Sequence, residues 1–275
     1  MRIAVHQMTS RVIPATNVAD MIGAIESAAA GGAVMYFAPE MSIMVNRKRE
    51  DARLQISSEA QTESIERIAQ VASRNKIWVH LGSVPVVHDD GKQLANRSII
   101  ISADGKTIAR YDKIHLFDVD LQTGESWRES SAYVGGESPV IVHTPLGKMG
   151  LAVCYDMRFP DLFSAYAKAG VDIITLPSAF TVPTGTAHWH ALLRARAIES
   201  ECFVIAAAQC GLHEDGRETY GHSLVVDPWG AVILDMESES GLAFVDLNLA
   251  KIAEVRQQIP VHQNRRAIAE PRVYE

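Results

Sequence analysis

The sequence predicts an α/β protein whose layers contain mixed β-sheets. Short apolar runs rich in β-branched residues recur along all 275 residues, and stretches with helical spacing lie between several of them. Strands first alternate with helices, and strand–strand pairs follow later in the chain. No low-complexity linker and no repeat of fixed period interrupts the sequence, so we expect one domain over residues 1–275.

The strand predictions rest on apolar runs, many of which are bounded by Gly, Pro, Asp or Ser. These runs are residues 3–5, 34–37, 77–81, 99–101, 140–142, 151–153, 173–176, 203–207, 224–226 and 242–245. Strand–strand pairs are expected within residues 99–111 and 223–234. Their turn signals are Asp104-Gly105 and Trp229-Gly230.

Four segments have the apolar spacing of amphipathic helices. They are residues 16–30, 60–74, 160–169 and 188–200. The first is followed by Gly31-Gly32, and the third begins at Pro160 and is followed by Gly170. These are the usual places of proline and glycine at helix ends.

The composition excludes several classes of function. With 26 basic and 33 acidic residues the net charge is −7, so we expect no nucleic-acid partner. No run approaches the length of a membrane span or of a signal peptide, so no membrane association is expected. The three cysteines fit neither a disulfide framework nor a zinc pattern, which favours reduced thiols in a cytoplasmic protein.

The segment around Cys154 is the most informative part of the chain. An apolar strand runs directly into this cysteine, a polar turn follows, and the helix that begins at Pro160 comes next. A cysteine at such an elbow can face a substrate as a nucleophile, although a core position is the alternative for a free cysteine. Cys202 and Cys210 have apolar neighbours, and we expect them to be core thiols.

Two other strand ends carry charged residues. Glu40 follows the run at residues 34–37, within Phe-Ala-Pro-Glu-Met, and Lys113 ends a strand within Arg-Tyr-Asp-Lys-Ile-His-Leu-Phe. Either residue alone would be an ordinary solvated surface residue. Together with Cys154 they would provide a base, a cation and a nucleophile.

These three segments, in this order, resemble the nitrilase superfamily of carbon–nitrogen hydrolases over essentially the whole chain. The resemblance implies an α-β-β-α sandwich, in which two mixed sheets pack face to face with helices outside. It also implies pairing into a homodimer or a higher homo-oligomer. By position it makes Glu40, Lys113 and Cys154 catalytic residues.

The resemblance further implies a second glutamate that assists catalysis. Glu129 is the best match, and Glu125 and Glu137 are the alternatives. Glu40 would act as general base, and a thioester would form on Cys154. The Lys113 ammonium and the backbone N–H of Tyr155 would stabilise the oxyanion. No metal or organic cofactor is expected.

Three further residues are candidates for substrate binding. Arg158 can bind a substrate carboxylate through its guanidinium, and an internal salt bridge with Asp156 or Asp161 is the alternative. Phe180 and Thr184 follow a buried strand and are candidates for packing on the substrate and hydrogen-bonding to it. The cluster His188-Trp189-His190 is expected to be structural, because histidines two positions apart face different sides of a helix.

Residues 206–213, 220–230 and 259–266 resemble one branch of the superfamily. That branch hydrolyses deaminated glutathione, a small carboxylate-bearing amide, to 2-oxoglutarate and cysteinylglycine. Residues 41–49 depart from the aromatic-rich stretch that is usual in this branch. The difference would affect the far wall of the substrate pocket. The alternatives are an ω-amidase acting on 2-oxoglutaramate, another amide or N-carbamoyl hydrolase, and a catalytically silent binding protein on the same fold.

Overall fold

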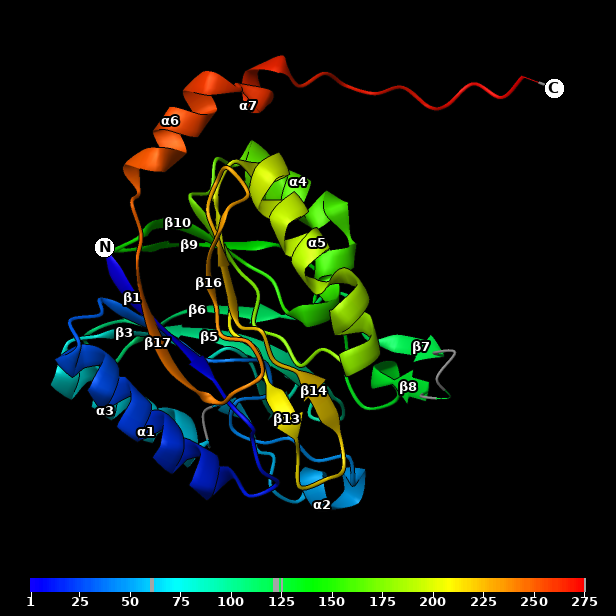
Figure 1. The fold of residues 1–275 in the computed structure, drawn as a ribbon. Coiled ribbons are helices and arrows are strands. Elements are labelled where there is room, and N and C mark those ends of the chain that lie inside the picture. The colour runs from blue at the N-terminus through cyan, green and yellow to red at the C-terminus, as the bar shows by residue number, and fades with distance from the viewer. Residues whose placement is uncertain (60–61, 121–123, 125, 275) are drawn as a thin grey trace.

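Two mixed β-sheets pack face to face, with helices on both outer sides (Figure 1). The computed structural model describes residues 1–59, 62–120, 124 and 126–274. In this part of the chain, no helix is both long and apolar enough to span a membrane. The expected α-β-β-α sandwich is confirmed.

The first sheet is built around the N-terminal strand, and β1, β2 and β3 run parallel in it. The neighbouring strands β17 and β5 are antiparallel to this group, as β4 and β6 are to β5. Its order is β17 (Gly241–Asp246), β1 (Arg2–Gln7), β2 (Met35–Phe37), β3 (Trp78–His80), β5 (Leu94–Ile101) and β4 (Val84–Val87), with β6 (Thr107–Asp112) paired to β5.

The second sheet has a parallel centre, formed by β10, β11 and β12, and antiparallel edges. Its order is β16 (Val232–Asp235), β15 (Leu224–Val226), β12 (Phe203–Ala206), β11 (Ile173–Thr175), β10 (Gly147–Leu151) and β9 (Val140–Thr144). Two hairpins complete the strands: β7 (Asp118–Asp120) with β8 (Ser126–Arg128), and β13 (Cys210–Leu212) with β14 (Glu218–Tyr220).

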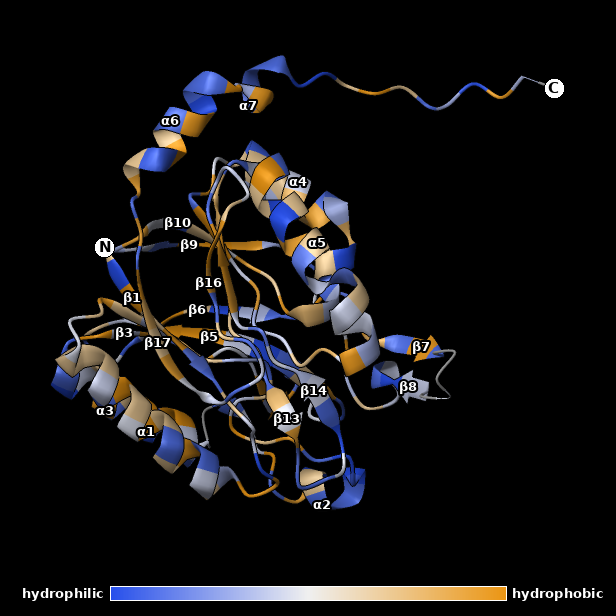
Figure 2. Ribbon diagram, in the orientation of Figure 1, coloured by the Kyte–Doolittle hydropathy of each residue, from blue (hydrophilic) through white to orange (hydrophobic). Residues whose placement is uncertain are grey.

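Side-chain alternation along the strands divides the core into two layers. In β1, Ile3 and Val5 join the core between the sheets, where they are packed with Leu151 of β10. Ala4, between them, belongs to the layer under the helices together with Met21 and Ile68. Figure 2 shows helices that carry both polar and apolar residues, as expected when one helix face packs on a sheet.

Helices α1 (Pro14–Ala30) and α3 (Glu63–Asn75) cover the first sheet, and α4 (Pro160–Lys168) and α5 (Val182–Ser200) cover the second. Further helical elements are α2 (Arg49–Arg53), η2 (Glu129–Ser131), η3 (Cys154–Arg158), α6 (Ala250–Gln258) and α7 (Val261–Asn264). After α7, residues 265–274 extend away from the body of the protein (Figure 1).

Several expected boundaries were wrong. The strand expected at residues 99–101 begins at Leu94. The helix expected from residue 188 begins at Val182, because Pro183 lies in its first turn, where a missing N–H costs nothing. The strand expected at residues 151–153 lies at Gly147–Leu151, because ladder pairing with β9 and β11 extends it over polar Lys148. Of the helix expected at residues 60–74, residues 60 and 61 lie outside the described part.

Candidate active site

Three strand ends bring Glu40, Lys113 and Cys154 to one cavity. Glu40 follows β2, Lys113 follows β6, and Cys154 opens η3 shortly after β10. The cavity has a volume of about 680 Å³, and Glu129 of η2 lines it as well. Residues separated by up to 114 positions in the sequence therefore share one site.

Three charged residues and one asparagine form a group that we call the carboxylate–lysine cluster. Its members are Glu40, Asn96, Lys113 and Glu129. The Lys113 Nζ donates to Glu40 Oε1 at 3.0 Å and to Glu129 Oε2 at 2.8 Å. The Asn96 Nδ2 donates to both carboxylates, at 2.9 and 3.2 Å. The sequence analysis missed Asn96, because an asparagine inside the apolar strand β5 has no motif that marks it.

Burial and neighbouring charges together set the protonation of Lys113 and Cys154. The exposed fraction is 4% for Glu40, 2% for Lys113 and 7% for Cys154. Burial alone would lower the pKa of Lys113, but the carboxylates of Glu129 and Glu40 hold it well above its ordinary value. Burial and the Glu40 charge raise the pKa of the Cys154 thiol, against the effect of Lys113. The resting site therefore holds an ammonium and a protonated thiol, which needs a base before it can attack.

The elbow at Cys154 is held by a buried carboxylate. Cys154 has a φ of 48°, a left-handed conformation that costs free energy for any residue with a Cβ. Asp156, fully buried, accepts from the Val153 N–H at 2.9 Å, from the His115 N–H at 3.0 Å and from Tyr111 Oη at 2.7 Å. These bonds fix the strained turn that presents the sulfur to the cavity.

The turn that carries Glu40 is fixed in a similar way. The Glu40 Oε2 accepts from the Ala179 N–H at 2.9 Å, and its backbone carbonyl accepts from Gln209 Nε2 at 2.9 Å. Gly82 lies so close to this turn that a Cβ added there would be 1.9 Å from the carbonyl oxygen of Pro39. The close approach requires glycine at this position.

The residues expected to bind substrate lie in different places. Tyr155, Phe180 and Thr184 line the cavity, and Thr184 does so from the first turn of α5. Arg158 is not among the described residues that line the cavity. Its guanidinium carbon lies 5.5 Å from the ring centroid of Phe180 and 5.9 Å from that of Tyr155.

Neither salt bridge considered for Arg158 is formed. Within the described residues its guanidinium hydrogen-bonds instead to His188 Nδ1, at 3.3 Å. Asp156 accepts hydrogen bonds from His115 and from the backbone N–H of Val153. Arg158 thus stands next to two residues of the cavity wall without a carboxylate partner in this part of the chain.

The competing glutamates and cysteines occupy other surroundings. Glu137 is exposed and is absent from the described lining of the cavity, and Glu125 lies outside the described residues. Cys202 and Cys210 are buried free thiols. Burial raises the pKa of Cys202 far above its ordinary value, and no member of the carboxylate–lysine cluster is among the charges that act on it.

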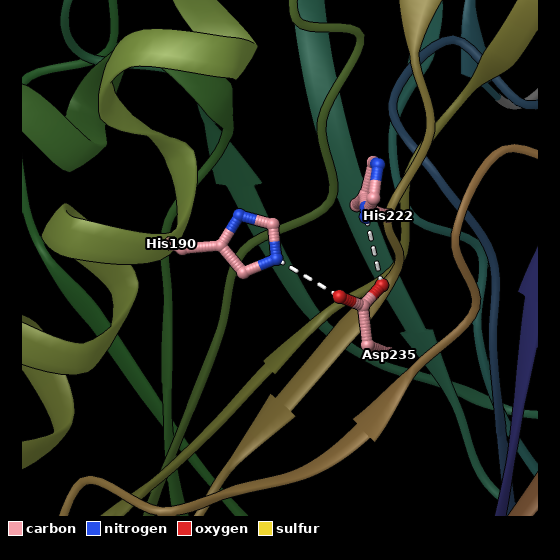
Figure 3. Close-up of side chains that lie close together, drawn as sticks. All are labelled: His190, His222 and Asp235. Atoms are coloured by element: carbon pink, nitrogen blue, oxygen red, sulfur yellow. Dashed lines mark hydrogen bonds and ion pairs between the residues drawn. The ribbon is translucent and has the colours of Figure 1, made fainter.

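A group of possible metal ligands lies elsewhere. The histidine cluster consists of His190, His222 and Asp235, on α5, before β15 and at the end of β16 (Figure 3). Two imidazoles with one carboxylate suit a divalent transition metal. Here both rings donate to Asp235, at 2.9 Å each. The carbonyl of His222 accepts from Trp189 Nε1, so the cluster supports a side chain packed on Phe180.

Comparison with known proteins identifies the family of this chain. Residues 2–257 match the carbon–nitrogen hydrolase family. The chain belongs to this family. It is therefore an enzyme that hydrolyses carbon–nitrogen bonds, and its expected place in the nitrilase superfamily is confirmed.

Relatives of this hydrolase with curated names cover most of its length. The deaminated glutathione amidase of Bos taurus is 41% identical over 270 residues, which are 96% of this chain and 81% of the relative. The deaminated glutathione amidase of Homo sapiens is 40% identical over 270 residues, with 96% and 82% covered.

Solved structures agree with the fold. The Caenorhabditis elegans NitFhit protein superposes with a TM-score of 0.89 at 37% identity; the match covers 96% of this hydrolase and 65% of that chain. Saccharomyces cerevisiae Nit3, a member of branch 10 of the nitrilase superfamily, gives a TM-score of 0.85 at 27% identity, with 95% and 94% covered. A mutant amidase from Nesterenkonia sp. AN1, with acrylamide added at its active site cysteine, gives 0.79 at 27% identity, with 96% and 99% covered.

Proposed function

We propose that this hydrolase is a thiol-dependent amidase that converts deaminated glutathione to 2-oxoglutarate and cysteinylglycine. One observation carries the chemistry: the Lys113 ammonium lies between the carboxylates of Glu40 and Glu129, in the cavity that Cys154 also lines. The relatives named deaminated glutathione amidase support this substrate. The same site would also serve 2-oxoglutaramate, which shares the acyl part.

Acylation begins with the Cys154 thiol. Because the pKa of this thiol is raised, Glu40 takes its proton as general base while Sγ attacks the amide carbon. The carbonyl oxygen gains negative charge and is stabilised by the Lys113 ammonium and the Tyr155 backbone N–H. Removal of one such donor typically costs roughly 3–4 kcal/mol of transition-state stabilisation. Glu129 keeps Lys113 charged for this role.

The carbon–nitrogen bond breaks in the next step. Protonated Glu40 gives its proton to the departing nitrogen, cysteinylglycine leaves, and the 2-oxoglutaryl group remains on Cys154 as a thioester. Glu40 then takes a proton from water as the water oxygen attacks the thioester carbon. The sulfur recovers a proton and 2-oxoglutarate is released, so the site returns to its resting state.

We also propose that the whole chain works as one domain, in a homodimer or higher homo-oligomer in the cytoplasm. The core between the sheets draws on residues from β1 to α6, which supports one domain. The extended segment 265–274 supports pairing, because it carries Ile268, Val273 and Tyr274 at 85–96% exposure. Three free thiols suit a reducing compartment.

The test compares two buried cysteines. The wild-type protein should hydrolyse deaminated glutathione, and Cys154→Ala should lose turnover by at least about 10⁴-fold while it keeps its fold. Cys202→Ala, the matched control, should keep its turnover. Mass spectrometry of the protein quenched during turnover should find a 2-oxoglutaryl adduct on Cys154.

Three results would change the proposal. Full activity of Cys154→Ala would remove the mechanism. Faster hydrolysis of N-carbamoyl amino acids than of deaminated glutathione would favour another hydrolase of the superfamily. Substrate binding without turnover by the wild-type protein would indicate a silent binding protein.

A further inference from the structure

A second group of cations lines the same cavity. Arg47 precedes α2, Trp127 lies in β8, and Arg217 immediately precedes β14. The guanidinium carbons of Arg47 and Arg217 each lie 4.8 Å from the ring centroid of Trp127. We call these three residues the arginine–tryptophan group.

Arg217 forms a long ion pair with Asp215, and the hydrogen-bonding capacity of its guanidinium is not filled by the described residues. Its Nη2 is 3.8 Å from Asp215 Oδ2, beyond hydrogen-bond range. Among the described residues, its buried Nε and the Trp127 Nε1 have no hydrogen-bond partner. Burial lowers the pKa of Arg217, against the charges of Asp215 and Glu40, and the charge of Arg47 adds to the lowering. Because buried donors without acceptors are costly, the group is suited to an anion from outside the chain.

The hairpin of β13 and β14 holds Arg217 in place. The His213 N–H donates to the Arg217 carbonyl at 2.8 Å across the turn that contains Asp215 and Gly216. The ring of buried His213 hydrogen-bonds to Thr219 Oγ1 and to the Ser10 carbonyl, at 2.8 Å each. A cation on such a fixed turn is preorganised for a ligand.

The other arginines of the cavity wall already have partners. Arg128 donates to both carboxylate oxygens of Asp120, at 2.7 and 2.9 Å. Arg49 donates to the Arg128 carbonyl and Arg53 to the Lys92 carbonyl. The arginine–tryptophan group is therefore chemically distinct from the rest of this wall.

We infer that the arginine–tryptophan group binds the C-terminal carboxylate of the departing cysteinylglycine. A guanidinium can hold a carboxylate through two parallel hydrogen bonds. The cavity volume of about 680 Å³ is in the range of sites for drug-sized ligands, roughly 300–1,000 Å³, and leaves room for a leaving group much larger than ammonia. The inference rests on the proposed function and explains how the extended amide is distinguished from 2-oxoglutaramate.

The experiment measures kcat/KM for two substrates with the full-length protein. Arg217→Gln should lower kcat/KM for deaminated glutathione by about 10- to 100-fold, the range for loss of a hydrogen bond to a charged group. It should leave 2-oxoglutaramate hydrolysis within about twofold of wild type, because that substrate lacks the dipeptide. Arg217→Lys should recover part of the loss, since it keeps the charge without the planar fork.

A modified substrate tests whether Arg217 and the substrate carboxylate act on each other. Deaminated glutathione with its C-terminal carboxylate amidated should be a poor substrate for the wild type, and Arg217→Gln should cause no further loss with it. Arg2→Gln, at an arginine that Asp246 holds outside the described lining of the cavity, is the matched control and should behave as wild type with all substrates.

Equal losses with both unmodified substrates, or a loss in Arg2→Gln as large as in Arg217→Gln, would overturn the inference. The same follows if the amidated substrate is hydrolysed as well as the acid by the wild type. If the wild type hydrolyses neither unmodified substrate, it is the proposed function that fails, so the two failures are distinguishable.

Discussion

The carboxylate–lysine cluster and the histidine cluster both place carboxylate oxygens against nitrogen donors, but in different surroundings. The side chain of Lys113 is 2% exposed, whereas the side chains of the histidine cluster are 24–37% exposed. Glu40, Lys113 and Glu129 of the first cluster line the cavity together with Cys154; the second cluster is absent from its described lining. The same types of contact thus occur in the proposed catalytic site and in a cluster away from it.

The comparison teaches that contact geometry alone does not identify an active site. Hydrogen-bond lengths are 2.7–3.2 Å in nearly all such pairs, whatever their role. Charges that are shielded from water interact more strongly, and removal of one partner leaves the other unsatisfied. Effects of substitution should therefore differ greatly between the two clusters, and the following changes test this.

The largest effect is expected for Lys113→Met. It should lower kcat/KM by at least about 100- to 1,000-fold, because it removes an oxyanion donor. It should also lower the free energy of unfolding by about 3–5 kcal/mol, because Glu40 and Glu129 are then buried without their cation. Steady-state kinetics and urea denaturation would measure both quantities.

A double variant separates the two effects of this substitution. In Lys113→Met with Glu129→Gln, one stranded carboxylate is removed, so part of the lost stability should return while activity stays low. Recovery of activity together with stability would show that Lys113 acts only on the fold.

An intermediate effect is expected for Glu129→Gln. Its Oε2 accepts from Lys113 Nζ at 2.8 Å and from the Phe117 N–H at 2.6 Å, so the neutral amide weakens the hold on the ammonium. We expect kcat to fall by about 10- to 100-fold. Glu137→Gln, an exposed change in the same stretch of chain, should leave kcat unaltered. An equal loss in both variants would argue against a specific role of Glu129.

The smallest effect is expected for Asp235→Asn in the histidine cluster. Burial alone would raise the pKa of Asp235, but hydrogen bonds from His190 and His222 hold it below its ordinary value. A lowered pKa stabilises the fold above the unfolded-state value of about 3.9, and this contribution is lost as the pH falls through the folded-state pKa.

The variant should therefore be less stable than wild type by up to about 1 kcal/mol near neutral pH, and the difference should shrink on acidification. Denaturant titrations from about pH 7 to about pH 2 would measure it. Turnover should not change. A loss of turnover comparable to that of Glu129→Gln would move the histidine cluster into the catalytic machinery.

Part of the site could be predicted because some residues carry local signals. Cys154 follows an apolar strand and precedes a proline-started helix, and Glu40 and Lys113 end strands in segments that resemble known hydrolases. Asn96 and Arg217 lack such signals. Asn96 lies in β5, and its Nδ2 donates to Glu40 Oε1. Arg217 lines the cavity from the hairpin of β13 and β14. In both regions, contacts between segments far apart in the chain complete the arrangement.

The fold was predicted to a similar degree. Apolar runs located β1, β2, β3 and β15 almost to the residue, because buried strands need continuous hydrophobic sequence. The short strands β4, β7, β8, β13 and β14 were missed. Polar residues make up most of β7, and the pairing of β7 with β8 and of β13 with β14 is decided by the hairpin partner.

The sequence by itself determined the α/β class, the superfamily and the three segments that carry Glu40, Lys113 and Cys154. Local chemistry suffices for these, because strand hydrophobicity and strand-end motifs lie within a few consecutive residues. Only the tertiary structure decided which glutamate among the described candidates meets the lysine, that Asp156 holds the elbow, and which arginines face the cavity with no hydrogen-bond partner among the described residues. Those outcomes depend on distances between side chains far apart in the chain, which folding alone brings together.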